Sequence, residues 1–394
     1  MKNYENIIKE NKCWAEKLFE ALEKKLSVMS ERSRDKIPSN IDEKGMHNDA
    51  GPSDWVSGFW GGLNLLMYKK TGKENYLLTA KSTERRQDEV FSDFEIFHHD
   101  VGFMWHILSG AIYRITGDER SKNRNLWAAS SLMSRFVLGG NFIRAWNDSN
   151  AKGWPGRPVK NWTIIDCMMN LPLLYWASEV IEDDRFKRVA MMHADKAIQT
   201  HIRADGSVIH IVEHDRDIGE VVETFGGQGY EDGSSWSRGQ AWGLYGFVLS
   251  YLATGEVRYL DAAKRISNYF IASCIDDWLP RVDFRAPDEP TYYDTSAATC
   301  AAAGLLELAK ALPENEGGSY ALAAVNILKA VTDKFLNLDE STDRILSHGT
   351  ERYPVPGKYS EAVAGVHRTL IYADYFLVEA LLKLTGEKFN PWVG

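Results

Sequence analysis

Two short segments of the sequence combine a charged residue with bulky apolar neighbours, in a way that suits acid–base chemistry on an anionic ring. Asp166 opens an otherwise apolar stretch that runs to Pro172, and Arg238 stands between Trp236 and Trp242. A charge removed from water costs several kcal/mol unless it is paired, so stability alone explains neither residue well. We therefore expect a pocket in which the arginine binds an anion and the aspartic acid delivers a proton.

The elements that must position these residues repeat along the chain. Six times, an apolar segment rich in Gly, Ala and Leu ends at a glycine or another helix breaker, and an amphipathic segment usually follows it, as in 243–270. A glycine just after a helix supplies a left-handed cap, and a helix that is apolar all round is buried. The spacing of about 45 to 75 residues is too irregular for a solenoid.

Six helical hairpins can close into a ring, with the apolar helices inside and the amphipathic helices outside. Too few residues follow Thr385 to form the outer helix of the sixth hairpin, and the amphipathic segment 4–26 can supply this helix. The predicted fold is therefore all-α, an (α/α)6 barrel that forms a single domain over residues 1–394. The exception is 206–223, where alternating side chains around a turn at 215–219 predict a short β-hairpin over the barrel mouth.

In such a ring all inner helices point the same way, so residues near their starts converge at one mouth. Asp100 belongs to the second predicted inner helix, Asp166 to the third and Arg238 to the fourth. Six helix N-termini also create a field that favours an anion. Simpler interpretations stay open at this point: the two aspartates can be N-caps, and Trp60 and Trp242 can be ordinary core residues.

Composition narrows the class of partner. The net charge of −9 argues against nucleic acid and against an anionic membrane surface, and 13 Trp and 17 Tyr are compatible with sugar rings as ligands. No apolar run is long enough for a membrane span, the N-terminal residues lack the apolar core of a signal peptide, and the four cysteines are scattered. We expect a cytoplasmic protein, a monomer or homodimer, with no metal and no cofactor.

Three segments together resemble the unsaturated glucuronyl hydrolases of glycoside hydrolase family 88: 165–176, 236–242 and Ile143-Arg144-x-Trp146-Asn147. That family acts on oligosaccharides released by polysaccharide lyases, which carry a 4,5-unsaturated uronic acid at the non-reducing end. The resemblance implies that Asp166 is the general acid/base and that Asp100 is a second essential carboxylate. It also implies a set of residues that line the subsite for the unsaturated sugar: Trp60, His210, Gln228, Arg238 and Trp242.

The chemistry implied by this resemblance is hydration of an enol ether. Protonation of sugar carbon 4 creates a cation at carbon 5, water adds there, and the resulting hemiketal opens and releases the neighbouring sugar. The geometry of ordinary glycosidases, with two carboxylates flanking the anomeric carbon, need not apply. Since a free aspartic acid has a pKa of about 3.9, a protonated donor requires burial or a neighbouring carboxylate, and we expect a mildly acidic optimum.

The loop 347–360 precedes the sixth inner helix and is expected to overhang the mouth. Three residues of this loop are candidates for binding a carboxylate, sulfate or hydroxyl group on the leaving sugar: Arg352, Lys358 and Ser360. Three alternatives stay open: an unsaturated rhamnogalacturonyl hydrolase with the same fold and chemistry, a sugar 2-epimerase of the same fold that uses histidines, and a non-catalytic helical scaffold.

Overall fold

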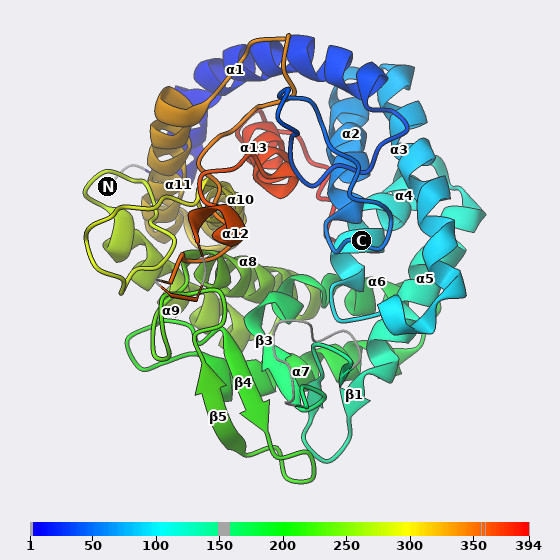
Figure 1. The fold of residues 1–394 in the computed structure, drawn as a ribbon, viewed down its shortest axis with the longest axis vertical. Helices are drawn as coiled ribbons and strands as arrows, with labels where there is room; N and C mark the ends of the chain where they lie inside the picture. The colour runs from blue at the N-terminus through cyan, green and yellow to red at the C-terminus, as the bar shows by residue number, and fades with distance from the viewer. Residues whose placement is uncertain (1–2, 149–157, 356, 359, 394) are drawn as a thin grey trace.

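The computed structural model describes residues 3–148, 158–355, 357–358 and 360–393, and in them helices form two concentric rings (Figure 1). The inner ring contains α2 (Ser57–Thr71), the π-helix η3 (Gly102–Gly110) continued by α4 (Ala111–Thr116), the 3-10 helix η5 (Ile165–Met169) followed by α6 (Pro172–Val180), α8 (Ser237–Thr254), α10 (Thr295–Ala311) and α13 (Ile371–Leu384). The outer ring contains α3 (Glu74–Gln87), α5 (Glu119–Ser134), α7 (Asp184–His201), α9 (Val257–Cys274), α11 (Glu314–Phe335) and α1 (Tyr4–Arg32). Each inner segment packs against both ring neighbours and one outer helix, which confirms the predicted (α/α)6 barrel.

The N-terminal helix α1 completes the outer ring, as the sequence predicted. It lies between α3 and α11 in Figure 1 and contacts both, together with α13. Its buried apolar residues recur at intervals of three to eight positions and include Ala15, Leu22, Leu26 and Met29. This spacing puts them on one stripe of the helix, and that stripe faces the barrel.

The division into inner and outer helices follows from the distribution of apolar residues. In α8, every residue from Ser237 to Ser250 is buried, so this helix has no solvent-facing side over most of its length. In α9 the buried residues Tyr259, Ala262, Ala263 and Ile266 follow the three-and-four spacing of a one-sided helix. Left-handed glycines end three inner helices as predicted: Gly72, Gly117 and Gly255.

Two small sheets lie outside the rings. The predicted hairpin is β4 (Ile211–His214) and β5 (Val221–Phe225), which pair antiparallel. Strand β3 (Trp162–Ile164), which the sequence analysis missed, pairs antiparallel with β4 and leads directly into η5. The remaining short elements are β1 (Phe136–Val137), β2 (Phe142–Ile143), the 3-10 helices η1 (Asp88–Ser92) and η2 (Phe94–Ile96), and α12 (Glu361–Ala364).

The C-terminal segment fills the barrel at the end where the inner helices finish. Trp392 is 1% exposed, stacks on Phe376 and donates from its indole nitrogen to Glu379 at 3.0 Å. Arg114, near the end of α4, donates to the carbonyl oxygens of Asn390 and Val393. The opposite end, where the inner helices begin, is therefore the mouth.

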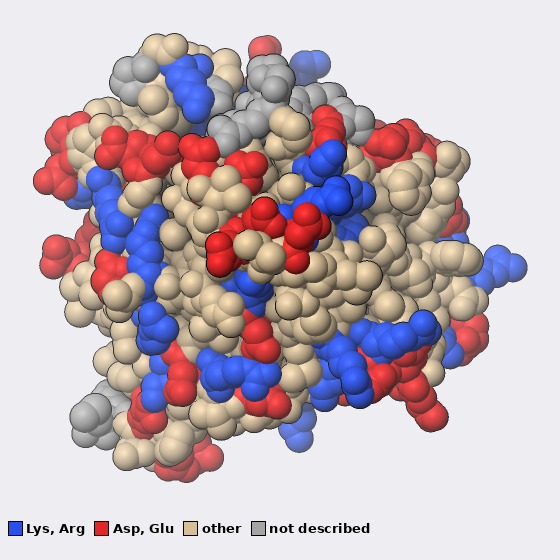
Figure 2. All heavy atoms as spheres, turned by 90° about the horizontal axis from the view of Figure 1, so that it is seen from below, with Lys and Arg blue, Asp and Glu red and all other residues tan. Residues whose placement is uncertain are grey.

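Charged side chains of both signs occur on the face drawn in Figure 2. On the face in Figure 2, positive and negative groups are interspersed, and no continuous field of one sign covers it. Among the residues that the structure describes, no helix combines the length and apolar character needed to cross a membrane.

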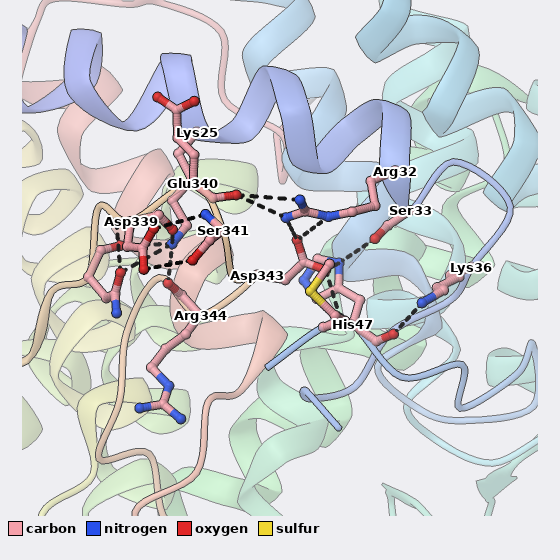
Figure 3. A network of polar contacts seen from close by, with 12 residues as sticks. Lys25, Arg32, Ser33, Lys36, His47, Asp339, Glu340, Ser341, Asp343 and Arg344 are labelled. Carbon is pink, nitrogen blue, oxygen red and sulfur yellow. Dashed lines mark hydrogen bonds and ion pairs between the residues drawn. The ribbon is translucent and has the colours of Figure 1, made fainter. Parts of the chain in front are cut away.

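Buried polar contacts fix the closure of the ring, where α1 meets the segment 337–346 that follows α11 (Figure 3). The Lys25 side chain has no exposed surface, and its Nζ donates to the carbonyl oxygens of Asn337, Asp339 and Arg344 at 3.1, 2.7 and 2.5 Å. Arg32 at the end of α1 pairs with Asp343 of the same segment. One ammonium group therefore supplies the donors for three carbonyl groups of a loop.

Replacement of this lysine should destabilise the fold. We expect Lys25→Met to lower the free energy of unfolding by about 2 kcal/mol, because the buried carbonyl groups lose their donor while the apolar stem is kept. Urea titration followed by circular dichroism measures the change. Lys24→Met, at an exposed position of the same helix, should stay within about 0.5 kcal/mol of the parent. Equal stabilities of the two variants would contradict this role for Lys25.

Candidate active site

Asp166 lies in the first turn of η5, directly after strand β3. Its side chain is 13% exposed, but Oδ1 is buried and lies 3.3 Å from His210 Nε2. The N-cap position of η5 belongs to Ile164, so the interpretation of Asp166 as an N-cap does not hold. The carboxyl group instead faces the residues that converge at the barrel mouth.

Contacts on two sides fix the His210 ring. The backbone N–H of Gln228 donates to Nδ1 at 3.1 Å, and the Trp236 ring lies 4.3 Å away between centroids. Because Nδ1 accepts, the proton of the neutral imidazole is on Nε2, the nitrogen that faces Asp166. Gly227 allows this approach: it has φ +63°, and a Cβ atom there would lie 2.1 Å from Nδ1.

Asp100 lies just before the π-helix η3, whose N-cap is Val101, so it is not an N-cap either. Its carboxylate is 13% exposed, and Oδ2 lies 3.3 Å from both His98 Nδ1 and His99 Nε2. Burial raises the pKa of Asp100, but His99, His98 and a hydrogen bond from Asn170 lower it by a larger amount. The pKa of Asp100 is therefore below its usual value. Burial also lowers the pKa of His99, to about 4. Asp100 is therefore an ionised carboxylate near neutral pH.

Asn170 joins the two aspartate segments, and the sequence analysis did not single it out. Its Nδ2 donates to Asp100 Oδ1 at 3.3 Å and to the Asp166 carbonyl oxygen at 3.2 Å, and its Oδ1 accepts from Phe103 N at 2.9 Å. The side chain is completely buried. A polar residue within the apolar stretch after Asp166 was the signal that could have identified it.

A cavity of about 210 Å³ lies beside these residues and is lined by Ser39, Asp54, Trp55, Val56, Gln228, Arg238, Glu351, Arg352, Leu370 and Tyr372. Gln228 connects it to His210, and the Trp55 ring lies 5.6 Å from Phe103, whose N–H binds Asn170. The volume is below the roughly 300–1,000 Å³ of drug-sized sites, so the cavity is suited to a small polar group or a single ring. A larger cavity of about 630 Å³ lies at the opposite end, against Arg114 and Phe389, away from the carboxylates.

Arg238 lines this cavity, but its guanidinium is also bound by the protein. It is 1% exposed, donates to Asp294 Oδ2 at 2.6 Å and to the carbonyl oxygens of Thr350 and Glu351 at 2.7 and 2.6 Å, and lies over the Trp236 ring. Burial would lower its pKa, but Tyr372 and Asp294 raise it above the usual value. Arg238 is thus a permanent cation that also holds the wall of the cavity.

Two of the expected subsite residues, Trp60 and Trp242, lie in the core of this structure and do not line the cavity. Trp60 has no exposed surface, and its Nε1 donates to the Ser33 carbonyl oxygen at 3.2 Å. Trp242 is equally buried, with its ring against Phe103. An indole without an exposed face cannot stack on a sugar. The tryptophan at the cavity is Trp55, five positions before Trp60.

Glu351 and Arg352 line the cavity and bond to the end of α12. The N–H groups of Glu351 and Arg352 donate to the carbonyl oxygens of Gly365 and Ala364, which follow and end this helix. Lys358 and Ser360 are exposed, and the Ser360 hydroxyl accepts from Val363 N as the N-cap of α12. Pro356 and Tyr359 lie outside the described residues.

The site has the components for proton transfer to a bound anion: an ionised carboxylate, a second carboxyl group that faces a histidine, and a cavity with a permanent cation. Within the described part of the chain, no three His, Cys, Asp or Glu side chains are grouped so that they could hold a metal ion.

Comparison with known proteins identifies a consistent set of relatives. The model of Glycosyl Hydrolase Family 88 matches residues 29–334. The unsaturated glucuronyl hydrolase of Bacillus sp. (strain GL1) is 35% identical over 345 residues, which are 86% of this chain and 88% of that protein. The crystal structure of an unsaturated glucuronyl hydrolase from Bacillus sp. GL1 superimposes with a TM-score of 0.86 at 33% identity, over 95% of this chain and 98% of that chain. The unsaturated chondroitin disaccharide hydrolase of Streptococcus agalactiae serotype III (strain NEM316) is 30% identical over 379 residues, 94% of this chain and 92% of that protein. An Asp-to-Asn variant of an unsaturated glucuronyl hydrolase from S. agalactiae, solved with dGlcA-GalNAc6S, superimposes with a TM-score of 0.80 at 26% identity over 97% of this chain and 94% of that chain.

The tautomer of His210 can be tested directly. Nitrogen-15 NMR of histidine-labelled protein near neutral pH should show Nδ1 without a proton and Nε2 with one. Gly227→Ala should displace the ring and change this pattern, because the added Cβ would meet Nδ1. Gly233→Ala is the control: it lies in the same loop with φ +84°, but its Cβ would meet nothing within 4 Å. The same signals in Gly227→Ala as in the parent would contradict the assignment.

Proposed function

Because the chain belongs to glycoside hydrolase family 88, we propose that this glycosidase removes the 4,5-unsaturated uronic acid from the non-reducing end of glycosaminoglycan-type oligosaccharides. The observation that carries the proposal is the convergence of Asp100 and Asp166 on Asn170, beside a cavity that contains Arg238. Membership of this family favours the glucuronyl hydrolase interpretation over a sugar 2-epimerase or a helical scaffold.

The cavity supports the binding of a uronate ring. Arg238 and Arg352 provide positive charge for the sugar carboxylate, and Gln228 provides a polar contact beside them. Trp55 offers an aromatic face at the same cavity. In this arrangement the unsaturated ring lies between Trp55 and the carboxyl groups of Asp100 and Asp166.

Asp166 is the proton donor in the proposed reaction. Its Oδ1 faces His210, which leaves Oδ2 to face the substrate. Transfer of the proton to sugar carbon 4 leaves a positive charge shared between carbon 5 and the ring oxygen, and the ionised Asp100 stabilises that charge. Water then adds to carbon 5 and gives its proton to the Asp166 carboxylate, which restores the acid. The hemiketal opens to a ketone, and the rearranged sugar loses its bond to its neighbour.

The remaining parts of the proposal come from composition. The net charge of −9 and the scattered cysteines support a cytoplasmic enzyme that acts without nucleic acid or a membrane surface as partner. We expect a monomer or homodimer that needs neither a metal nor another cofactor.

Replacement of the proton donor tests the mechanism. Asp166→Asn keeps the shape of the side chain but has no acidic proton, so kcat should fall by at least about 10²-fold. The measurement is loss of the near-ultraviolet absorbance of the conjugated double bond in lyase-made disaccharides. Asp217→Asn, at a 78% exposed position of the β4–β5 turn, should behave like the parent. An Asp166→Asn protein with unchanged circular dichroism and most of its activity would refute the assignment.

The loop with Lys358 is proposed to bind the leaving sugar. Lys358→Ala should lower kcat/KM about threefold more for a sulfated disaccharide than for its unsulfated counterpart, because an exposed ion pair contributes up to about 1 kcal/mol. Lys310→Ala removes another exposed lysine near the end of α10, away from the mouth, and should change both values alike. Equal ratios for Lys358→Ala would mean that another part of the mouth determines selectivity for sulfate.

A further inference from the structure

The contacts of Asn170 fix the orientation of its amide. Oδ1 accepts from the Phe103 N–H at 2.9 Å, so the NH2 group must point the other way. That group then reaches Asp100 Oδ1 and the Asp166 carbonyl oxygen at 3.3 and 3.2 Å. The complete burial of the side chain leaves no water to replace these bonds at low cost.

The backbone around Asn170 is packed tightly enough to prevent adjustment. Gly102, the first residue of the π-helix, approaches so closely that a Cβ atom there would lie 2.6 Å from Asn170 Oδ1 and 2.7 Å from its Cα. The helix that follows Asp100 and the segment that carries Asp166 are therefore in direct contact at this amide. The Asn170 side chain therefore bonds to both aspartate segments at the point where they touch.

Asn170 also influences the charge state of Asp100. A hydrogen bond donated to the ionised form of a carboxyl group favours that form. The titratable and charged groups that interact with Asp100 from the surrounding elements are His98, His99, Asp54, Cys167 and Arg135, and Asp166 interacts with the neighbouring His99. Burial raises the pKa of the Cys167 thiol well above its usual value, so this thiol adds no negative charge beside Asp100. The hydrogen bond from Asn170 adds to the effect of His98 and His99 in lowering the pKa of Asp100, so its loss should raise that pKa.

We propose that Asn170 is a positioning residue that keeps Asp100 ionised and fixes the position of its carboxylate relative to Asp166. This role rests on the functions proposed above for the two aspartates. It predicts that a change at Asn170 alters the pH dependence of the reaction and the chemical step, while substrate binding in the neighbouring cavity is affected less.

Asn170→Asp is the decisive variant. It keeps an acceptor for the Phe103 N–H, but it puts a second carboxyl oxygen against Asp100 Oδ1. Two adjacent carboxylates retain a proton to higher pH, so the acidic limb of the kcat/KM profile should move up by about one pH unit or more. Misplacement of Asp100 should lower kcat by roughly 10- to 100-fold, with a smaller change in KM. Asn170→Ala, which removes the donor without adding a charge, should move the limb in the same direction by less.

Asn64→Asp is the matched control. Asn64 is also completely buried and also donates to a carbonyl oxygen four residues earlier, that of Trp60 at 2.8 Å. It makes no contact with Asp100 or Asp166 in the described structure, so it should lose stability without any shift of the pH profile. A profile of Asn170→Asp or Asn170→Ala that coincides with that of Asn64→Asp, in protein that is folded by circular dichroism, would overturn the proposal.

Carbon-13 NMR titration of Asp100 separates this proposal from the assignment of the catalytic aspartates, because it requires no turnover. A raised pKa of Asp100 in Asn170→Ala supports the positioning role even if Asp100→Asn proves active, a result that would remove Asp100 from the mechanism. An unchanged pKa in Asn170→Ala overturns the positioning role even if Asp100→Asn is inactive.

Discussion

The buried ion pair between Arg238 and Asp294 is the interaction on which the barrel mouth depends. Two charges that are 1% and 0% exposed would be costly apart, but at 2.6 Å and with further hydrogen bonds they satisfy each other. The remaining donors of Arg238 hold the Thr350 and Glu351 carbonyl groups. Gln228 binds the same Glu351 carbonyl oxygen at 2.6 Å and donates to His210, which faces Asp166. An unbroken set of contacts therefore leads from α10 to the proposed proton donor.

The two aspartates show how one residue type can serve two purposes in one site. Asp100 accepts a hydrogen bond from Asn170 on one oxygen, and nitrogen atoms of two histidines lie 3.3 Å from the other oxygen. These groups lower the pKa of Asp100. Asp166 faces a single histidine on one oxygen, and in the proposed mechanism its other oxygen faces the substrate. Different surroundings of paired carboxyl groups are what acid–base enzymes use to separate the donor from the charge-stabilising group.

The barrel was predictable because its signals are local. Buried helices, glycine caps such as Gly72 and the amphipathic α1 can each be recognised from a short segment. The details of the mouth depend on which residues pack from distant segments. Trp55 and Trp60 have the same chemistry five positions apart, but Trp60 bonds to Ser33 in the core, whereas Trp55 lies against Phe103 beside the cavity. Strand β3 is three residues long and is recognisable only by its partner β4, almost 50 positions later.

The contacts of Lys25 have a consequence for the order in which the protein folds. The lysine and its three carbonyl acceptors are separated by 312 to 319 positions in a chain of 394 residues. During synthesis α1 leaves the ribosome before both of its neighbours, yet it cannot dock between α3 and α11 until the residues up to Phe335 have followed. Until then only the partners from α2 and α3 are available to it, such as Asn64 and Thr79, which bond to Ser30, and the part of α1 that packs on α11 stays uncovered. Such high contact order makes closure of the ring a late event, and a slow one.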